Sequence, residues 1–510
     1  MVAIVATHTA GERGKESMAE KTDSPGEGNL ATELPSRWLP GVPYRDLPDA
    51  VPIWKIIGAS AIISATAMGS GEFIIWPLIV SQVGFTIFWA AILAFFFQYI
   101  MNMEIERYAL VTGETAVTGF ARLWRHWGIF FIICAILPNM WAGWATGAST
   151  TITFWAGLGS GAVVPITIII LVSIGIALSV SPVVYQTVEK IQMAMIVMIV
   201  GFVVVAVVVA TDVGAWGALA RGSTVEIGQN IPAAVAVVGA AAMAGAIAFA
   251  GAGGANNLVQ ANWVRDKEMG MGAYIPNIVS PITGEEEATP GTGYMTRPTE
   301  ENFNRFRAWW KVANTEHFIT FFVLGLLVTM VLCALTFATI GVDPGREFGE
   351  FQFIEQEGQA LAQQVAPWFG TLFFIAGTII LFSTNLGVLD WVSRLVSDAL
   401  KTDYMEESET WTMSRLYFVV LWAMIIFGSI VVAGLISAPT TLLIISSSLS
   451  AVVMVFYNAL LIVINRRFLP DPLKLGGWRL GAMILSFLFF LFFAGWFVIA
   501  EVGSIFGFGG

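Results

Sequence analysis

Charged residues are scarce in this sequence. Asp, Glu, Lys and Arg make up 12% of the 510 residues, whereas a soluble domain is about one quarter charged. Residues 73–103, 127–188 and 416–465 contain none of the four. About 20 apolar residues span a bilayer, and helices satisfy their own backbone hydrogen bonds in lipid. The sequence therefore predicts an all-α polytopic membrane protein.

The residues that carry enzyme chemistry are also few. There are 3 histidines and 2 cysteines, and the sequence has no His-Glu-x-x-His motif, no phosphate-binding Walker motif and no plausible Ser-His-Asp set. Cys134 and Cys333 both fall in apolar segments, which excludes a zinc cluster. A net charge of -11 has the wrong sign for a nucleic-acid surface. We expect no enzyme, no resident cofactor and no nucleic-acid partner, and without an ATP site any transport would be secondary.

Hydropathy predicts eleven transmembrane helices. They lie near residues 54–82, 86–108, 127–156, 163–181, 185–210, 231–262, 317–340, 366–394, 414–436, 439–464 and 479–502. Of the 25 Lys and Arg residues, all but Arg221 and Arg346 fall on the side of the N-terminus. By the positive-inside rule, the N-terminus is cytoplasmic and the C-terminus extracytoplasmic. We expect an integral protein of the plasma membrane, with the lipid bilayer and a small ion or small-molecule substrate as partners.

The predicted organisation has a tail and one transmembrane domain. Residues 1–50 are polar and carry both charge signs, which is typical of a disordered cytoplasmic tail. Residues 51–510 would form the transmembrane transporter domain. Within it, 51–212 and 227–465 would be two repeats of five helices each, and 475–510 an extra helix 11.

Spans one and six each contain a segment that suits a continuous helix poorly. Glycine costs about 1 kcal/mol in a helix interior, and a charge at the bilayer centre costs about 2.5 kcal/mol or more. Broken helices at the first position of each half are what an inverted-repeat transporter needs for a site at the midplane. The alternative is that small residues simply allow close helix packing. The candidate substrate or metal site comprises Gly69, Ser70, Gly71, Glu72, Gly254, Asn256, Asn257 and Gln260.

Other polar residues inside the spans suggest further roles. Ser383, Thr384 and Asn385 in span eight are candidate ligands of a coupling ion, with ordinary hydrogen bonding between helices as the alternative. Three charged residues at the cytoplasmic end of span two, Glu104, Glu106 and Arg107, are expected to form an interfacial ion pair, with a gate as the alternative. His317 opens span seven and is not expected to be a ligand.

Two short segments carry a family resemblance. They are Gln98 followed by Glu106-Arg-Tyr-Ala-Leu-Val-Thr-Gly-Glu114, and Val188-Glu-Lys-Ile-Gln192. Both look like stretches of the natural resistance-associated macrophage protein (Nramp) family of divalent-metal transporters. The resemblance runs from about residue 54 to 464 and implies the leucine-transporter-like fold, with a 5+5 inverted repeat, broken helices 1 and 6, and alternating access.

The sequence departs from this family at its signature motifs. Gly69-Ser70-Gly71-Glu72 stands where the family has Asp-Pro-Gly-Asn, and Gly254-Ala255-Asn256-Asn257 where it has Met-Pro-His-Asn. With the Asp and the soft Met ligand gone, an oxygen-only site would suit Mg²⁺ or Ca²⁺ better than Mn²⁺ or Fe²⁺. Acids that carry protons in the family align with Trp141 and Trp144, which makes proton coupling doubtful.

Three functions therefore stay open. The first is transport of a divalent metal cation, with Glu72 as the charged ligand. The second is a Na⁺- or H⁺-coupled symporter of amino acids or another small organic solute. The third is a membrane receptor or scaffold that does not transport. The sequence fixes neither the direction of transport nor the oligomeric state.

Overall fold

The computed structural model describes residues 30–56, 59–180, 184–227, 229, 231–275, 278, 292–346, 351–434 and 439–505. Eight of the described helices are long and apolar enough to cross a membrane. They are His126–Ala156, Ser160–Ser179, Val184–Ala210, Glu300–Ile340, Pro367–Tyr404, Met413–Gly434, Pro439–Arg467 and Gly477–Glu501. They correspond to predicted spans three to five and seven to eleven. The prediction of an all-α polytopic membrane fold is confirmed.

The other three predicted spans differ from simple apolar helices. Span two is helix α5 (Trp89–Thr112), whose inner half carries amide and carboxyl side chains. Span one is divided into α3 (Ala59–Ala67), the π-helix η2 (Gly71–Ile75) and α4 (Trp76–Val83). Predicted span six (231–262) begins with α12 (Ile231–Val238), which is bent by 95° from α13 (Ala240–Ala248). The 3-10 helix η4 (Gly254–Val259) and α14 (Gln260–Asp266) follow. Both predicted breaks are present.

Glycine makes the two breaks possible. In span six, Gly251, Gly253 and Gly254 have φ angles of 113°, 68° and 57°, a region that other residues rarely adopt. In span one, a Cβ atom on Gly71 would lie 1.8 Å from the Phe249 carbonyl oxygen. The two broken spans therefore cross in direct backbone contact.

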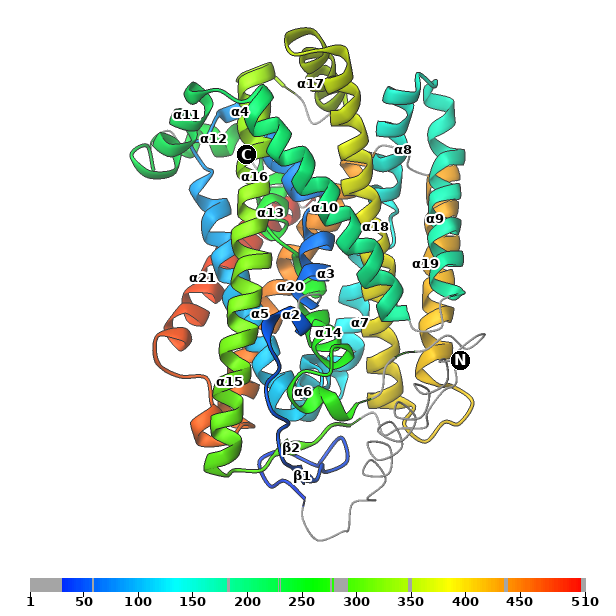
Figure 1. The fold of residues 1–510 in the computed structure, drawn as a ribbon, viewed down its shortest axis with the longest axis vertical. Coiled ribbons are helices and arrows are strands. Elements are labelled where there is room, and N and C mark those ends of the chain that lie inside the picture. Colours follow the sequence, from blue (N-terminus) through cyan, green and yellow to red (C-terminus); the bar gives the residue numbers. More distant parts are fainter. Residues whose placement is uncertain are drawn as a thin grey trace, which may run out of the picture.

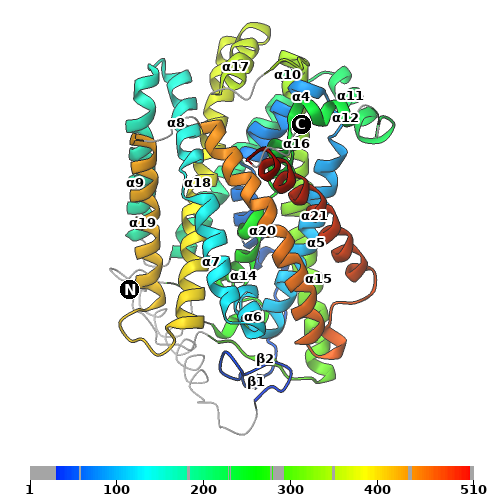
Figure 2. The ribbon, with the colours of Figure 1, turned by 180° about the vertical axis from the view of Figure 1, so that it is seen from behind.

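The remaining helices surround this crossing (Figure 1). The longest, α18 (Pro367–Tyr404), packs against α3, α8 (Gly143–Ala156), α10 (Val184–Ala210) and α19 (Met413–Gly434). From behind, α20 (Pro439–Arg467) and α7 (His126–Asn139) cover the same centre, and α21 (Gly477–Ile505) lies along α20 and α13 (Figure 2). The division into repeats 51–212 and 227–465 stays a prediction.

The segment before span one corrects the predicted disorder of residues 1–50. Residues 30–50 are folded, and Val42 and Leu47 are fully buried. Strand β1 (Tyr44–Arg45) pairs in parallel with β2 (Met295–Thr296). Leucine and valine residues in this largely polar segment are buried against the rest of the protein. The overall polar composition of residues 1–50 did not indicate these contacts. Residues 1–29 lie outside the described residues.

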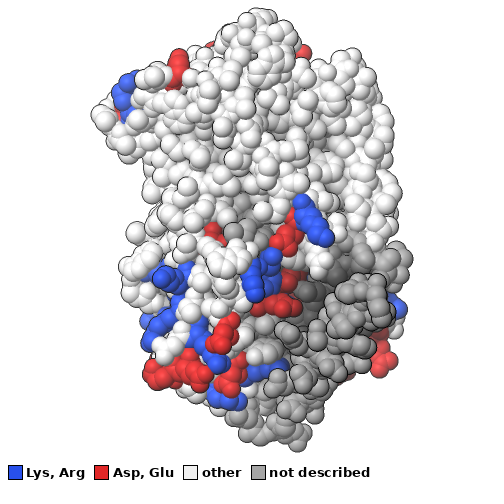
Figure 3. All heavy atoms as spheres, in the orientation of Figure 1, with Lys and Arg blue, Asp and Glu red and all other residues white. Residues whose placement is uncertain are grey.

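Charged side chains gather toward one end of the molecule. In the space-filling view, Lys, Arg, Asp and Glu concentrate on the lower part, around β1, β2 and α15 (Glu300–His317), and the upper part is mostly uncharged (Figure 3). This agrees with the charge asymmetry of the sequence. The orientation of the termini across the membrane remains a prediction.

Candidate functional site

A small cavity of about 20 Å³, with room for about one water molecule, lies between the two broken spans. It is lined by Thr66, Ser70, Gly71, Asn139, Trp144, Phe249, Gly251, Ala252, Gly253, Asn256, Thr384, Val388, Trp391 and Ser450. The lining residues belong to spans one, three, six, eight and ten. None of them has an ionisable side chain.

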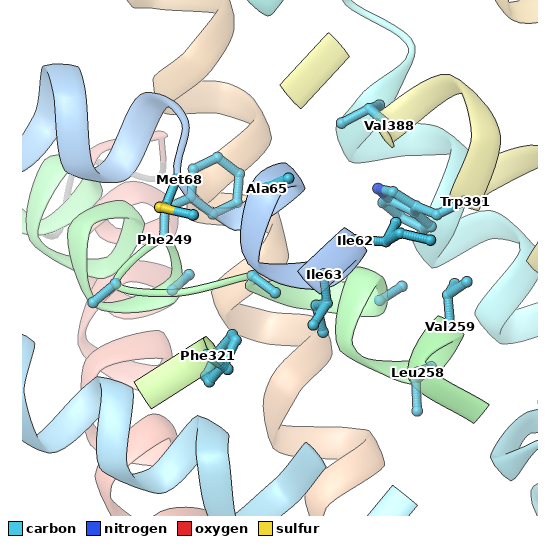
Figure 4. Close-up of a cluster of buried hydrophobic side chains, with 14 of the residues drawn as sticks. Ile62, Ile63, Ala65, Met68, Phe249, Leu258, Val259, Phe321, Val388 and Trp391 are labelled. Carbon is cyan, nitrogen blue, oxygen red and sulfur yellow. The ribbon is translucent and has the colours of Figure 1, made fainter. Parts of the chain in front are cut away.

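Aromatic rings form much of the cavity wall. The Trp144 and Phe249 rings are 6.0 Å apart, and Trp144 Nε1 donates a hydrogen bond to Ser70 Oγ at 3.1 Å. Phe249 lies beside Met68 at the end of α3, and Trp391 lies with Val388 across α3 from them (Figure 4). These rings give the cavity apolar, electron-rich faces.

Two polar atoms at the cavity have no hydrogen-bond partner among the described residues: Asn256 Oδ1 and Trp391 Nε1. The other polar end of Asn256, Nδ2, donates to the Ala252 carbonyl at 3.3 Å. Buried polar atoms normally have a partner. One acceptor and one donor beside the cavity are therefore left unpaired.

Glu72 does not line this cavity. Its side chain is fully buried. Its Oε2 accepts a hydrogen bond from the Gly69 amide at 2.9 Å, and its Oε1 accepts one from the Gly251 amide at 3.2 Å. The carboxylate thus satisfies amides that the two breaks leave without helical partners. The predicted role of Glu72 as a ligand facing the substrate is not supported by this geometry.

Gln98 of α5 holds the second break in shape. Its Nε2 donates to the carbonyls of Ala248 and Ala250 at 2.9 and 2.7 Å, and its Oε1 accepts from the Gly253 amide at 2.9 Å and from Asn257 Nδ2 at 3.3 Å. One side chain therefore replaces several hydrogen bonds that an unbroken helix would make. In the sequence, Gln98 stands out only through the resemblance to the Nramp family.

The structure separates the predicted site residues into two groups. Ser70, Gly71 and Asn256 line the cavity. Gly69, Glu72, Gly254, Asn257 and Gln260 are buried around it and are not among its lining residues. Asn257 donates to the Tyr457 hydroxyl at 2.7 Å, and Gln260 donates to Glu106 at 2.7 Å.

The aromatic residues of the cavity were not predicted as site residues. Trp144 and Trp391 are two of 19 tryptophans, and Phe249 is one of 37 phenylalanines, in a chain where apolar residues are the background. The only sequence signal was the alignment of Trp144 with an acid of the Nramp family. Their position at the breaks becomes visible only in the folded chain.

The span-eight residues have three different surroundings. Ser383 Oγ lies 3.2 Å from the Ala65 carbonyl and also hydrogen-bonds to Gln192 Oε1, and Gln192 Nε2 donates to the Ser383 carbonyl at 3.0 Å. Thr384 lines the cavity. Asn385 is buried. The amide group of Gln192 thus hydrogen-bonds to Ser383, one of the predicted coupling-ion ligands. The ion-binding role stays a prediction.

Ion pairs tie α14 to neighbouring helices below the cavity. Arg394 on α18 pairs with Asp390 at 2.7 Å and also with Asp266. Arg265 pairs with Asp398 at 2.8 Å. Because these side chains are almost fully buried, the pairs hold the second half of span six against span eight.

Comparisons with known proteins agree with the fold. No protein-family model and no curated protein sequence matches the chain. Crystal structures of a manganese transporter from Eremococcus coleocola are similar, both as a mutant and in complex with an aromatic bis-isothiourea substituted compound. Each has a TM-score of 0.65 and 13% sequence identity, over 94% of this chain and 92% of the transporter. At this identity the likeness concerns the fold: the chain is an all-α integral membrane protein of the leucine-transporter-like class.

Proposed function

We propose that this chain is a secondary transporter of a small organic solute that lacks a carboxylate group. The observation that carries the proposal is the cavity at the crossing of the two broken spans, whose lining combines Trp144, Phe249 and Trp391 with hydroxyl and amide groups and no ionisable side chain. The polarity of this lining is typical of sites for organic ligands. The cavity itself is water-sized, so the surrounding spans must move apart to admit such a solute.

The position of Glu72 argues against a carboxylate on the solute. In transporters with broken helices, the N-terminus of a half-helix receives the anionic group of the substrate. Here the carboxylate of Glu72, in the first turn after the break, already accepts hydrogen bonds from the Gly69 and Gly251 amides. A neutral solute or an organic cation fits better, since aromatic faces attract cations.

The same observations give less support to divalent cations, the substrate class favoured by the sequence. Mg²⁺ and Ca²⁺ need several oxygen ligands, usually with carboxylates among them. Within the described part of the chain, no group of three His, Cys, Asp or Glu side chains could hold a metal ion. The similarity to the manganese transporter concerns the fold. The residues that line the cavity include no carboxylate, histidine or thiol that would bind a metal ion.

Uptake into proteoliposomes tests the proposal. The probes are choline as an organic cation, cytosine as a neutral planar solute, leucine as a carboxylate-bearing solute, and Mg²⁺ and Mn²⁺. We expect saturable uptake of choline or cytosine, reduced at least tenfold in Trp391→Leu. The exposed Trp478→Leu serves as a matched control. Uptake of a metal ion or of leucine alone would overturn the proposal. Binding without uptake of any probe would favour the receptor alternative.

A further inference from the structure

Three titratable side chains meet below the cavity, outside the site described above. Glu106 lies on α5, and Glu316 and His317 lie at the end of α15, all with at most 2% of their surface exposed. His317 Nδ1 is 3.8 Å from Glu106 Oε1. The Tyr99 and Phe321 rings stack on the imidazole of His317 at 5.8 and 4.8 Å. We call Glu106, Glu316 and His317 the acid-histidine cluster.

The cations near this cluster are engaged elsewhere. Arg107, one residue further along α5, pairs with Glu104 at 2.6 Å. Arg479 of α21 pairs with the same carboxylate at 2.8 Å. Within the cluster, Glu106 and Glu316 repel each other electrostatically, and Arg479 lies within electrostatic reach of Glu106. The charged and titratable groups that act on Glu106 from neighbouring helices are thus Glu316, His317 and Arg479.

Two buried carboxyl groups that repel each other cannot easily both be ionised. Burial disfavours the charged form, and a like charge nearby disfavours it further. Ionisable residues inside membrane spans are costly, and chains of Asp, Glu and His carry protons in pumps and transporters. A proton bound by the cluster removes one negative charge from a low-dielectric environment. Its release leaves a buried charge, which the hydrogen bond that Glu106 accepts from Gln260 helps to stabilise.

A hydrogen bond connects the cluster to the broken span. Gln260 Nε2 donates to Glu106 Oε1 at 2.7 Å. Gln260 is the first residue of α14 and lies one helical turn beyond Asn256, which lines the cavity. The charge on Glu106 therefore acts directly on the half-helix that borders the substrate cavity.

We propose that the acid-histidine cluster is a proton-binding site that couples protonation to the movement of the second half of span six. In each cycle one proton from the solution on one side of the membrane binds the Glu106 carboxylate, weakens its bond to Gln260, and leaves on the other side. The coupling would drive the solute transport proposed above, and in that respect the inference rests on the proposed function.

Cysteine accessibility tests the inference without any solute. Ser450→Cys places a thiol at the cavity in a chain that also carries Cys134→Ser and Cys333→Ser. In inside-out membrane vesicles, labelling by a membrane-impermeant maleimide is measured between about pH 5 and pH 8, relative to labelling of the unfolded protein at the same pH. We expect a severalfold change with pH. In Glu106→Gln, which mimics the protonated acid, labelling should stay at the low-pH value throughout.

Controls separate coupling from damage to the fold. Glu357→Gln removes a buried carboxyl group on α17 (Gln352–Gln364), away from the cluster, and should keep the pH response of the parent chain. Glu106→Asp should restore it in part. The inference is overturned if the parent chain shows no pH response, or if Glu106→Gln responds as the parent does. Because no solute is present, a failure of the uptake experiments would leave this result unaffected.

Discussion

The carboxylate of Glu72 joins two backbone amides that are far apart in the chain, those of Gly69 and Gly251, and Gly251 lies 179 positions after Glu72. The one acid in span one thus belongs to the framework of both breaks. Replacing Glu72 tests this framework role directly.

Glu72→Gln should destabilise the protein and leave the chemistry of the cavity unchanged. The amide has one acceptor oxygen, and its NH₂ group would face a backbone amide donor. A buried donor left unsatisfied costs about 1–3 kcal/mol. We expect a lower unfolding temperature in detergent, and choline or cytosine binding with unchanged affinity in the fraction that remains folded. If Glu72→Gln kept the unfolding temperature of the parent chain and lost metal binding, Glu72 would instead be a metal ligand.

Gly71→Ala should prevent the close crossing of the two broken spans. Its Cβ atom would lie 1.8 Å from the Phe249 carbonyl oxygen, so the backbones must separate. Overpacking of this kind costs about 1–3 kcal/mol. Gly201→Ala in α10 is the matched control, because nothing lies within 4 Å of the added atom. Thermal unfolding should distinguish the two variants, and equal unfolding temperatures would show that the crossing can relax.

Gln98→Leu should collapse the second break. The substitution removes the donor that serves the Ala248 and Ala250 carbonyls and the acceptor that serves the Gly253 amide. We expect a loss of about 2 kcal/mol or more of stability, since each buried group left unpaired costs about 1–3 kcal/mol, and no uptake of any probe. The exposed Gln359→Leu on α17 is the control. Uptake at the parent rate in Gln98→Leu would contradict the bracing role.

Asp266→Asn should loosen the lower half of span six. The substitution weakens the pair with Arg394 and keeps the Arg394–Asp390 pair at 2.7 Å. Maleimide labelling of Ser450→Cys from the cytoplasmic side should increase severalfold. Lys267→Gln, which breaks a more exposed pair with Glu189, should have a smaller effect. Unchanged labelling in Asp266→Asn would show that the pair does not keep the inner side closed.

Glu357 gives a pH dependence that can be assigned to one group. Burial raises the pKa of this outer-loop carboxyl group from 4.5 to about 8. The folded protein therefore binds more protons than the unfolded chain between these values, so this group's contribution to stability is full below about pH 4.5 and declines up to about pH 8. Unfolding temperatures measured across this range should fall less steeply in Glu357→Gln than in the parent chain. Parallel curves would contradict the assignment.

Composition was enough to predict the helical fold, because long apolar segments have few alternatives in lipid. The two breaks were also predictable, since Gly69, Gly71, Gly251 and Gly253 stand where a span should be continuous. The site was predicted only in part. Sequence shows that Glu72 is a charge inside the membrane, but it does not show which way the carboxylate points or that two amides take both oxygens.

The aromatic residues of the cavity could not be predicted as site residues from the sequence. Trp391 has no feature in the sequence that separates it from the many large residues facing lipid or other helices. Its indole becomes part of a site because α18 passes beside α3 at that level. The folded segment 30–50 escaped prediction for a similar reason, since its partners lie about 250 residues further along the chain, as in the contact of Leu47 with Asn302.

The contacts of residues 30–50 limit how span one can move. Leu47 donates its amide hydrogen to Asn302, and Trp309 donates to the Pro48 carbonyl. Arg305 adds a hydrogen bond to the Leu47 carbonyl and an ion pair with Asp49, so several contacts fasten the chain entering span one to α15. Only a few residues separate these contacts from α2 (Ile53–Ile56). This end of span one is therefore restrained: to tilt outward it must carry α15 along or first release these contacts.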